Sequence, residues 1–372
     1  VNQFTLLAIP CFVLAGSIMG RSGITEELVD IMKAIVCRIS GGLAIVTILV
    51  CMFFAAISGS GPGTVAAVGG LLIPAMLKDG YEKDFASAVS ASGGVLGVLI
   101  PPSNPMIIYG VIASLSIGDL FIAGILPGLF MGLMLLIPAY TISRKYHYGN
   151  VEKFSVYRLL NSIWKGKFAL MMPFIVLGGI YAGVVTPVEA AVIAVIYALF
   201  VAIFIKRTLD IRGVWACLSE ASTICGGLVV IMGTAVFFGE FLTLNLVPQA
   251  VASAILGFVS SKYVLLLIIT LMLLFLGTFM ETLSIIMILA PILLPMVKEF
   301  GVDPIHFGVI LAMTSAMGMM TPPLGVNLFV ACNLTGLSLE QVARRSIPFI
   351  LFMLVGLSVV VLFPELSLLL LK

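Results

Sequence analysis

The chain has 372 residues, of which 61% are hydrophobic and 10% are charged, and its formal net charge is +2. This composition excludes a soluble globular domain, and so small a charge gives no support for a nucleic-acid partner. We therefore expect an all-α polytopic protein in a lipid bilayer. The six cysteines form no C-x-x-C pair and lie in apolar or amphipathic segments, so we interpret them as buried thiols.

The chain opens with a short apolar segment at residues 4–19, followed by an amphipathic one at 24–39. Charges interspersed among regularly spaced Leu, Ile and Val are typical of a helix that lies along the membrane surface. Residues 1–40 are therefore predicted to form a scaffold helix and a first connecting arm helix. Because apolar sequence begins at once at a valine, we also expect an earlier helix to be missing.

Residues 41–118 contain a predicted hairpin. Two apolar arms, 42–57 and 64–77, flank the glycine-rich tip 58–63. At 1.5 Å per residue such arms reach roughly 21–24 Å, which is less than the ~30 Å hydrocarbon core. The pattern predicts a re-entrant helical hairpin whose tip is too rich in glycine to be helical and is buried by protein or by a wet cavity.

A broken transmembrane helix is predicted after the hairpin. The apolar run 85–100 is interrupted by Pro101-Pro102-Ser103-Asn104-Pro105 and resumes over 106–117. The first half-helix would end in unpaired carbonyl groups, which suit a small cation. The second would begin with unpaired N–H groups at the positive end of a helix dipole, which suit an anion.

Residues 119–245 are predicted to be scaffold helices, and 246–262 a second arm helix. Between them the polar loop 143–167 carries six Lys or Arg residues against one Glu. Segment 206–223 is again amphipathic and basic. The membrane spans of this region are expected at 120–142, 168–185, 190–205 and 226–241.

Residues 263–336 repeat the pattern of hairpin and broken helix. Two arms, 263–276 and 283–297, flank the tip 277–282, and the half-helix 305–320 breaks at Thr321-Pro322-Pro323-Leu324-Gly325. A polar turn at 337–346 and a C-terminal scaffold helix within 337–372 follow. The copies align without a gap at a separation of 221 residues, with these coincident pairs: Pro74 and Pro295, Gly80 and Gly301, Ala91 and Ala312, Gly97 and Gly318, Pro101 and Pro322, Pro102 and Pro323, Pro127 and Pro348.

The expected topology makes the two copies inverted repeats. Five crossings separate the hairpin entrances, and an odd number puts them on opposite faces of the membrane. With the loop 143–167 in the cytoplasm, sixteen of the nineteen Lys and Arg residues fall on that side, as the positive-inside rule requires. Interrupted apolar segments at matching places in two halves are the best sequence indication of a transporter binding site.

Few residues of this chain suit other chemistry. Glu281 in the second tip is an acid inside an apolar segment, and it is either a coupling acid or a structural partner of a half-helix. A proton-coupled transporter would use it for titration. A channel would need a continuous polar pore, whereas these polar sites form two local clusters. An intramembrane enzyme would need a nucleophile with a base, and no Ser/His or paired-Asp pattern is present, so we do not expect an enzyme.

At these residues the sequence resembles the large membrane subunit (M subunit, DctM-like) of tripartite ATP-independent periplasmic (TRAP) transporters, within the ion transporter superfamily. The matching stretches include Ser58-Gly-Ser-Gly, Ile100-Pro-Pro-Ser103, Gly277-Thr-Phe-Met-Glu281 and Thr321-Pro-Pro-Leu-Gly325. Many relatives carry Asp where Thr64 stands, so a carboxylate role does not transfer to this position.

The resemblance implies a multi-pass protein of the bacterial inner membrane. Its expected activity is sodium-driven uptake of an organic anion such as a C4-dicarboxylate or sialic acid. Its expected partners are a small four-helix membrane subunit (Q type) and a soluble periplasmic substrate-binding protein. It also implies an elevator, in which a transport domain, here 41–118 with 263–336, moves against the scaffold.

Two sodium sites are then expected, one in each repeat, with the anion between them. We expect sodium ligands from Ser58, Ser60, Ser103 and Asn104 in the first repeat, and from Gly277, Thr278, Thr282, Gly318, Thr321 and Gly325 in the second. The residues expected at the anion are Ser60, Gly61, Thr64, Asn104 and Asn327. Neither tip nor break contains an Arg, so the sequence does not identify a carboxylate contact.

Overall fold

The computed structural model describes residues 4–36, 38, 41–149, 155–245 and 261–371. Over these residues every regular element is helical. Seven of the described helices are long and apolar enough to cross a membrane, or up to nine spans if each of two bent pairs counts as one. The expectation of an all-α polytopic protein is therefore confirmed.

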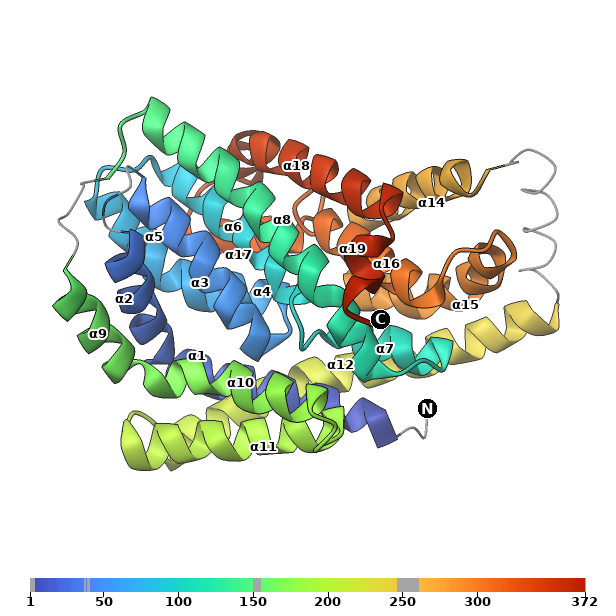
Figure 1. The fold of residues 1–372 in the computed structure, drawn as a ribbon, viewed down its shortest axis with the longest axis horizontal. Helices are drawn as coiled ribbons and strands as arrows, with labels where there is room; N and C mark the ends of the chain where they lie inside the picture. The colour runs from blue at the N-terminus through green and yellow to red at the C-terminus, as the bar shows by residue number, and fades with distance from the viewer. Residues whose placement is uncertain (1–3, 37, 39–40, 150–154, 246–260, 372) are drawn as a thin grey trace.

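The helices, shown in Figure 1, keep the order that the apolar segments predict. The first half contains α1 (Ala8–Arg21), α2 (Ile24–Val36), α3 (Gly42–Ser58), α4 (Gly61–Thr64), α5 (Gly70–Lys78), α6 (Lys83–Leu99), α7 (Asn104–Ala113) and α8 (Ile117–Lys145). The middle contains α9 (Val156–Lys165), α10 (Lys167–Tyr181), α11 (Pro187–Phe200) and α12 (Ile211–Leu244). The last part contains α14 (Lys262–Gly277), α15 (Thr282–Glu299), α16 (Pro304–Gly318), α17 (Val326–Thr335), α18 (Leu339–Leu362) and α19 (Glu365–Leu368).

The first hairpin reverses over two residues, so the expectation that the whole tip 58–63 is non-helical is wrong. Gly59 ends α3 in the left-handed region, with φ +58°, where glycine carries no steric penalty. Ser60 is extended and caps α4, since its hydroxyl accepts from the Gly63 N–H at 3.3 Å. Helix therefore resumes at Gly61 in spite of the glycines, and a π-helical turn (Val65–Gly69) connects α4 to α5.

The first helix break differs by a few residues from the prediction. Helix α7 begins at Asn104 rather than at residue 106, because Pro105 is accommodated in the first turn and Ser103 caps it. It ends at Ala113, four residues before the predicted end at 117, where Ser114 adopts a left-handed conformation with φ +55°. The second break, between α16 and α17, covers residues 319–325 and ends at Gly325, with φ +50°.

Three expectations for the remaining segments are wrong. Residues 211–223 and 226–241 are parts of one helix, α12, instead of two separate segments. Most of the expected polar turn 337–346 is helical, because a capping box between Ser338 and Gln341 starts α18 at Leu339. The loop 143–167 contains the amphipathic helix α9. The second arm helix, 246–261, lies almost wholly outside the described residues, which resume at Ser261.

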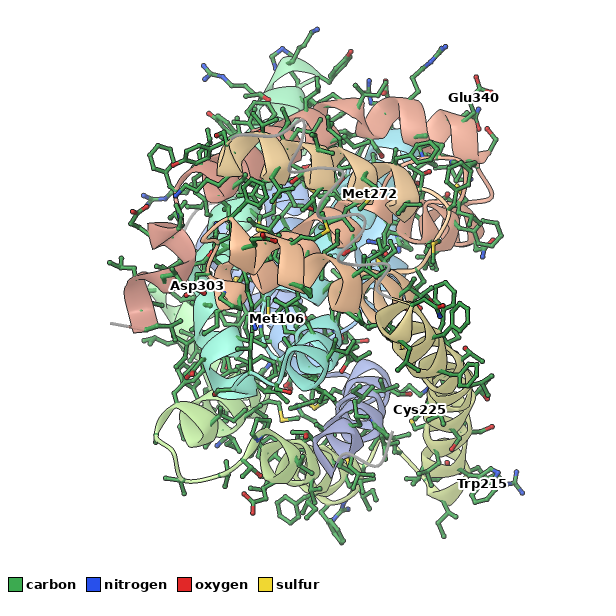
Figure 2. The ribbon with its side chains drawn as sticks, turned by 90° about the vertical axis from the view of Figure 1, so that its right-hand side faces the viewer. Met106, Trp215, Cys225, Met272, Asp303 and Glu340 are labelled. Atoms are coloured by element: carbon green, nitrogen blue, oxygen red, sulfur yellow. The ribbon has the colours of Figure 1, made fainter. Side chains whose placement is uncertain are left out.

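The helices pack in two groups. Every residue of α6 from Phe85 to Leu99 is buried, and its many Ala, Ser and Gly residues allow close approach of α3, α8, α17 and α18. Helix α16 is buried over its last thirteen residues and packs against α14 and α15. The other group is α11 on α1 and α10, with α12 along α1 (Figure 1), and α12 also packs against α15 of the first group. Figure 2 shows Trp215 at the far end of α12, projecting away from the rest of the molecule.

Candidate functional site

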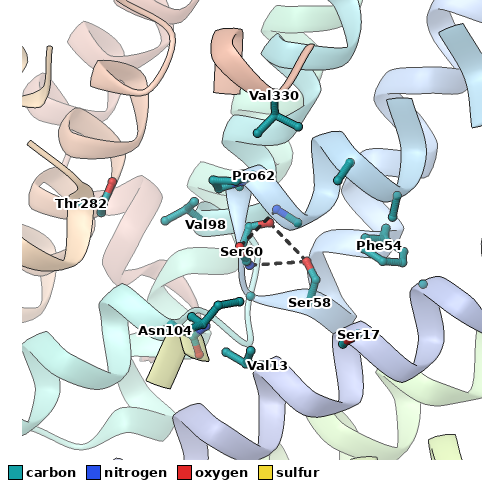
Figure 3. Close-up of a pocket in the computed structure, with 18 of the residues that line it drawn as sticks. Val13, Ser17, Phe54, Ser58, Ser60, Pro62, Val98, Asn104, Thr282 and Val330 are labelled. Atoms are coloured by element: carbon teal, nitrogen blue, oxygen red, sulfur yellow. Dashed lines mark hydrogen bonds between the residues drawn. The ribbon is translucent and has the colours of Figure 1, made fainter. Parts of the chain in front are cut away.

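A cavity of about 580 Å³ lies where the two hairpin tips and the two helix breaks meet α1 and α12. Figure 3 shows Ser58 and Ser60 on the first tip with Asn104 near them, Ser17 of α1 on one side and Thr282 of the second hairpin on the other. Of the predicted site residues, Ser58, Ser60, Gly61, Asn104, Glu281 and Thr282 line this cavity. Those that do not line it are Thr64, Ser103, Gly277, Thr278, Gly318, Thr321, Gly325 and Asn327.

Hydroxyl groups hold the first tip together. The Thr64 hydroxyl donates to the Ser60 carbonyl at 2.8 Å and lies 2.9 Å from the Ser58 hydroxyl. Thr64 is fully buried, so its side chain stabilises the turn from behind. Ser58 and Ser60, which flank the turn, both line the cavity.

Asn104 and Asn327 both contact the first tip, and each has a side-chain oxygen without a hydrogen-bond partner in the residues that the structure describes. A Cβ placed on Gly59 would lie 3.4 Å from the Asn104 amide nitrogen, and one on Gly61 would lie 3.0 Å from Asn327 Oδ1. In the described part of the chain neither Oδ1 atom has a hydrogen-bond donor, although both are buried. Such atoms are costly to bury without a partner, and each is therefore a candidate ligand for a cation or a substrate N–H or O–H.

Ser103 has a structural role in the first break. Its hydroxyl donates to the Val98 carbonyl near the end of α6 and accepts from the Met106 N–H of α7. One side chain therefore connects the two half-helices across the prolines. This arrangement turns its hydroxyl away from the cavity, which Asn104 lines instead.

The second tip is a turn at residues 278–281 that contacts the second break through backbone atoms. A Cβ on Gly318 would lie 2.5 Å from the Gly277 carbonyl carbon, so α14 and α16 touch through two glycines. The Leu324 N–H donates to the Thr278 carbonyl at 3.0 Å. The Thr278 and Thr321 hydroxyls donate back to carbonyls of their own helices. The Thr282 hydroxyl is buried and has no partner among the described residues.

Two charged residues of the cavity wall were missed by sequence reasoning. Arg21, the last residue of α1, donates from Nη2 to Oε2 of Glu220 on α12 at 2.8 Å, and Ser17 donates to the same oxygen at 2.9 Å. An Arg at the end of an apolar helix is expected from the positive-inside rule alone. The sequence therefore gave no signal that this one faces the cavity.

The described residues contain no group of three or more His, Cys, Asp or Glu side chains placed to hold a metal ion. The oxygens around the two tips are hydroxyl, amide and backbone carbonyl groups, which suit hard monovalent cations as ligands, together with the Glu281 carboxylate.

Residues 1–366 match the protein family described as "Tripartite ATP-independent periplasmic transporter, DctM component". The chain belongs to this family. Membership makes it a permease component of a TRAP transporter rather than an enzyme, and confirms the resemblance seen in the sequence.

Curated relatives of this TRAP permease carry different substrate names. It is 46% identical to the isethionate TRAP transporter permease protein DctMQ of Oleidesulfovibrio alaskensis, over 95% of this chain and 56% of that protein, so it spans about half of that relative's length. It is 41% identical to the C4-dicarboxylate large permease protein DctM of Pseudomonas aeruginosa, over 99% of this chain and 86% of that one. It is 37% identical to the sialic acid large permease protein SiaM of Vibrio cholerae, over all of this chain and 87% of that one.

A solved structure has the same fold. The Alcanivorax borkumensis YdaH transporter, described as having an unusual topology, superposes with a TM-score of 0.66 over 95% of this chain and 84% of that one. The sequences are 17% identical, so this likeness concerns the fold alone.

Proposed function

We propose that this permease carries out sodium-coupled uptake of an organic anion through the cavity between the two hairpin tips. The relatives named above are called permeases for isethionate, C4-dicarboxylates and sialic acid, all of which are organic acids. The observation that carries the proposal is the convergence of both tips and both breaks on one cavity in a member of this family.

We propose two sodium positions. The first is at Ser58, Ser60 and Asn104, and the second at Thr282 with the backbone of residues 277–278 and 318–325. The unpartnered oxygens of Asn104 and Thr282 support these positions, because a desolvated cation needs several oxygen ligands. Neutral ligands of this kind bind a cation without burying further negative charge.

A proton is the second candidate for the coupling ion. Glu281 lines the cavity and is the acid that a proton-coupled transporter would titrate. A sodium gradient and a proton gradient applied separately to the same vesicles distinguish the two mechanisms.

The proposed partners are a periplasmic binding protein and a small Q-type subunit in the bacterial inner membrane. The name DctMQ and the greater length of that relative support a Q-type partner. We therefore expect this chain alone to transport little free substrate.

The function is tested in proteoliposomes that contain this chain with its small subunit and its binding protein. Succinate, N-acetylneuraminate and isethionate are supplied in turn, with inward gradients of sodium, potassium or protons. We expect uptake of one of these anions with the sodium gradient, and little uptake when the binding protein is left out. Uptake with a proton gradient alone, abolished by Glu281→Gln, would assign coupling to the acid.

We also propose elevator motion of residues 41–118 and 263–336, which contain the hairpins and broken helices. Helices α8 and α18, which the sequence analysis assigned to the scaffold, pack on α6, so we propose that they move with it. Helices α1, α10, α11 and α12 form the proposed scaffold.

Two cysteine pairs test this motion. Cβ atoms at Gly20 and Ala67 are 3.8 Å apart and join α1 to the first hairpin, while those at Gly69 and Ser90 are 3.3 Å apart and join two parts of the moving unit. In a background without native cysteines, both pairs are compared before and after oxidation. We expect oxidation to stop uptake only for Gly20→Cys with Ala67→Cys. Full activity of that crosslinked pair excludes the proposed motion.

A further inference from the structure

The charges around the cavity come from three described residues. Arg21 and Glu220 stand on α1 and α12, and Glu281 stands at the second tip. The hairpin tips and helix breaks therefore place one acid and no base at the cavity. An anion that enters needs a positive partner, and in the described part of the wall Arg21 is the one cationic side chain.

The position of Arg21 is fixed by its own helix. Val13, Gly16, Ser17, Gly20 and Arg21 all line the cavity, and their spacing puts them on one face of α1. That face touches the first tip, since a Cβ on Gly16 would lie 2.9 Å from Ser58 Cα. Figure 3 shows Ser17 on this face, beside Ser58. Arg21 follows one turn later at the same wall.

The guanidinium is held on one side and accessible on the other. Its Nη2 donates to Glu220, whose Oε2 also accepts from Ser17. Within the described residues Nη1 and Nε have no protein acceptor, and the Arg21 side chain keeps 48% of its surface exposed. A planar guanidinium can therefore bind a carboxylate or sulfonate through its free edge while Glu220 holds the other.

We propose that Arg21 is the contact for the acidic group of the substrate, and that Glu220 positions it. This inference rests on the proposed function, because it identifies which residue of that site recognises the anion. The Arg21–Glu220 pair is neutral, so the empty cavity does not hold a strong positive charge that would retain the anion. Since the pair stands on the proposed scaffold, the contact is made from outside the hairpin unit.

The test is the Michaelis constant of three variants for whichever of succinate, N-acetylneuraminate and isethionate the wild-type system transports. Arg21→Gln should raise the KM about 10- to 100-fold, the effect of losing a hydrogen bond to a charged group, and Arg21→Lys should raise it less. Glu220→Gln keeps the hydrogen-bonding shape but leaves Arg21 unneutralised, so it should lower the KM. The sodium concentration for half-maximal uptake should stay unchanged in all three.

The expected KM is higher in Arg21→Gln and lower in Glu220→Gln. If Arg21 and Glu220 formed only a structural salt bridge, both variants would lose activity to a similar extent. Lys33→Gln, on α2 and away from the cavity, is the matched control and should behave as the wild type. A normal KM in Arg21→Gln, or parallel losses of activity in Arg21→Gln and Glu220→Gln, would overturn the inference while leaving the proposed function intact. Failure of the wild-type system to transport any of the three anions overturns both.

Discussion

The two copies of the sequence repeat pack in the same way at a shared glycine, but the side chains at their tips differ. Gly97 and Gly318 are 221 residues apart, and each presses against its own hairpin at the tip or beside it. A Cβ on Gly97 would lie 2.5 Å from the Ser60 carbonyl oxygen, and one on Gly318 would lie 2.5 Å from the Gly277 carbonyl carbon. In both copies a half-helix therefore approaches a tip so closely that a side chain cannot fit.

The tips themselves differ. The first reverses over two residues and is held by three hydroxyl-bearing side chains, Ser58, Ser60 and Thr64. The second is a four-residue turn held mainly by backbone contacts, and it contributes the acid Glu281. The shared glycines determine how closely each hairpin packs against its broken helix. The tip residues differ between the aligned copies, and they determine what each copy can bind.

The largest expected effect is at the shared glycines. Gly97→Ala and Gly318→Ala should each abolish uptake, because the new methyl meets backbone that cannot move aside, and overpacking costs about 1–3 kcal/mol. Uptake and thermal unfolding in detergent are the measurements. Gly178→Ala is the control, since no atom lies within 4 Å of its Cβ position. Normal uptake by either variant would show that the two contacts are not equivalent.

A smaller effect is expected at the unpartnered oxygens. Asn104→Leu and Thr282→Val should each raise the sodium concentration for half-maximal uptake, roughly 5- to 150-fold for about 1–3 kcal/mol of lost ligation. Thr270→Val is matched to Thr282→Val, because the Thr270 hydroxyl is also buried without a described partner but lies away from the cavity. If only one of these variants changed the sodium concentration for half-maximal uptake, the proposal would be reduced to one sodium position. If neither did, both proposed positions would be wrong.

The smallest effect is expected at another coincident pair, Gly80 and Gly301. Both have positive φ, +82° and +72°, and neither has an atom within 4 Å of its Cβ position. Alanine at either position should therefore cost only the left-handed backbone penalty, about 1–2 kcal/mol of stability, with KM unchanged. Thermal unfolding measures the cost, and asparagine should restore part of it. If only one of the two alanine variants lost stability, the structural equivalence of the two copies would be confined to the residues around the cavity.

The sequence determined where helices form and end, because apolar length, prolines and capping side chains act on neighbouring residues. Apolar runs predicted most of the helices, and the prolines at 101–102 and 322–323 predicted both breaks. Two hairpin arms that apolar length made too short to cross, however, lie in helical stretches long enough to do so, Gly61–Lys78 and Thr282–Glu299. The errors have local causes as well. A capping serine restarted helix at Gly61 within a glycine-rich tip, and one uninterrupted helix joins residues 211–223 to the span that follows.

The composition of the cavity wall was decided by tertiary structure. Ser60, Asn104, Glu281 and Thr282 could be named from the sequence, since polar residues at helix interruptions are conspicuous in apolar segments. Asn327 was assigned to the anion by its position in the second break, yet packing across the repeats places its amide against Gly61. Arg21 and Glu220 are 199 residues apart, and each has an ordinary place in its own helix. They form one charged pair at the cavity because α1 and α12 pack together, a long-range contact that helix periodicity does not encode.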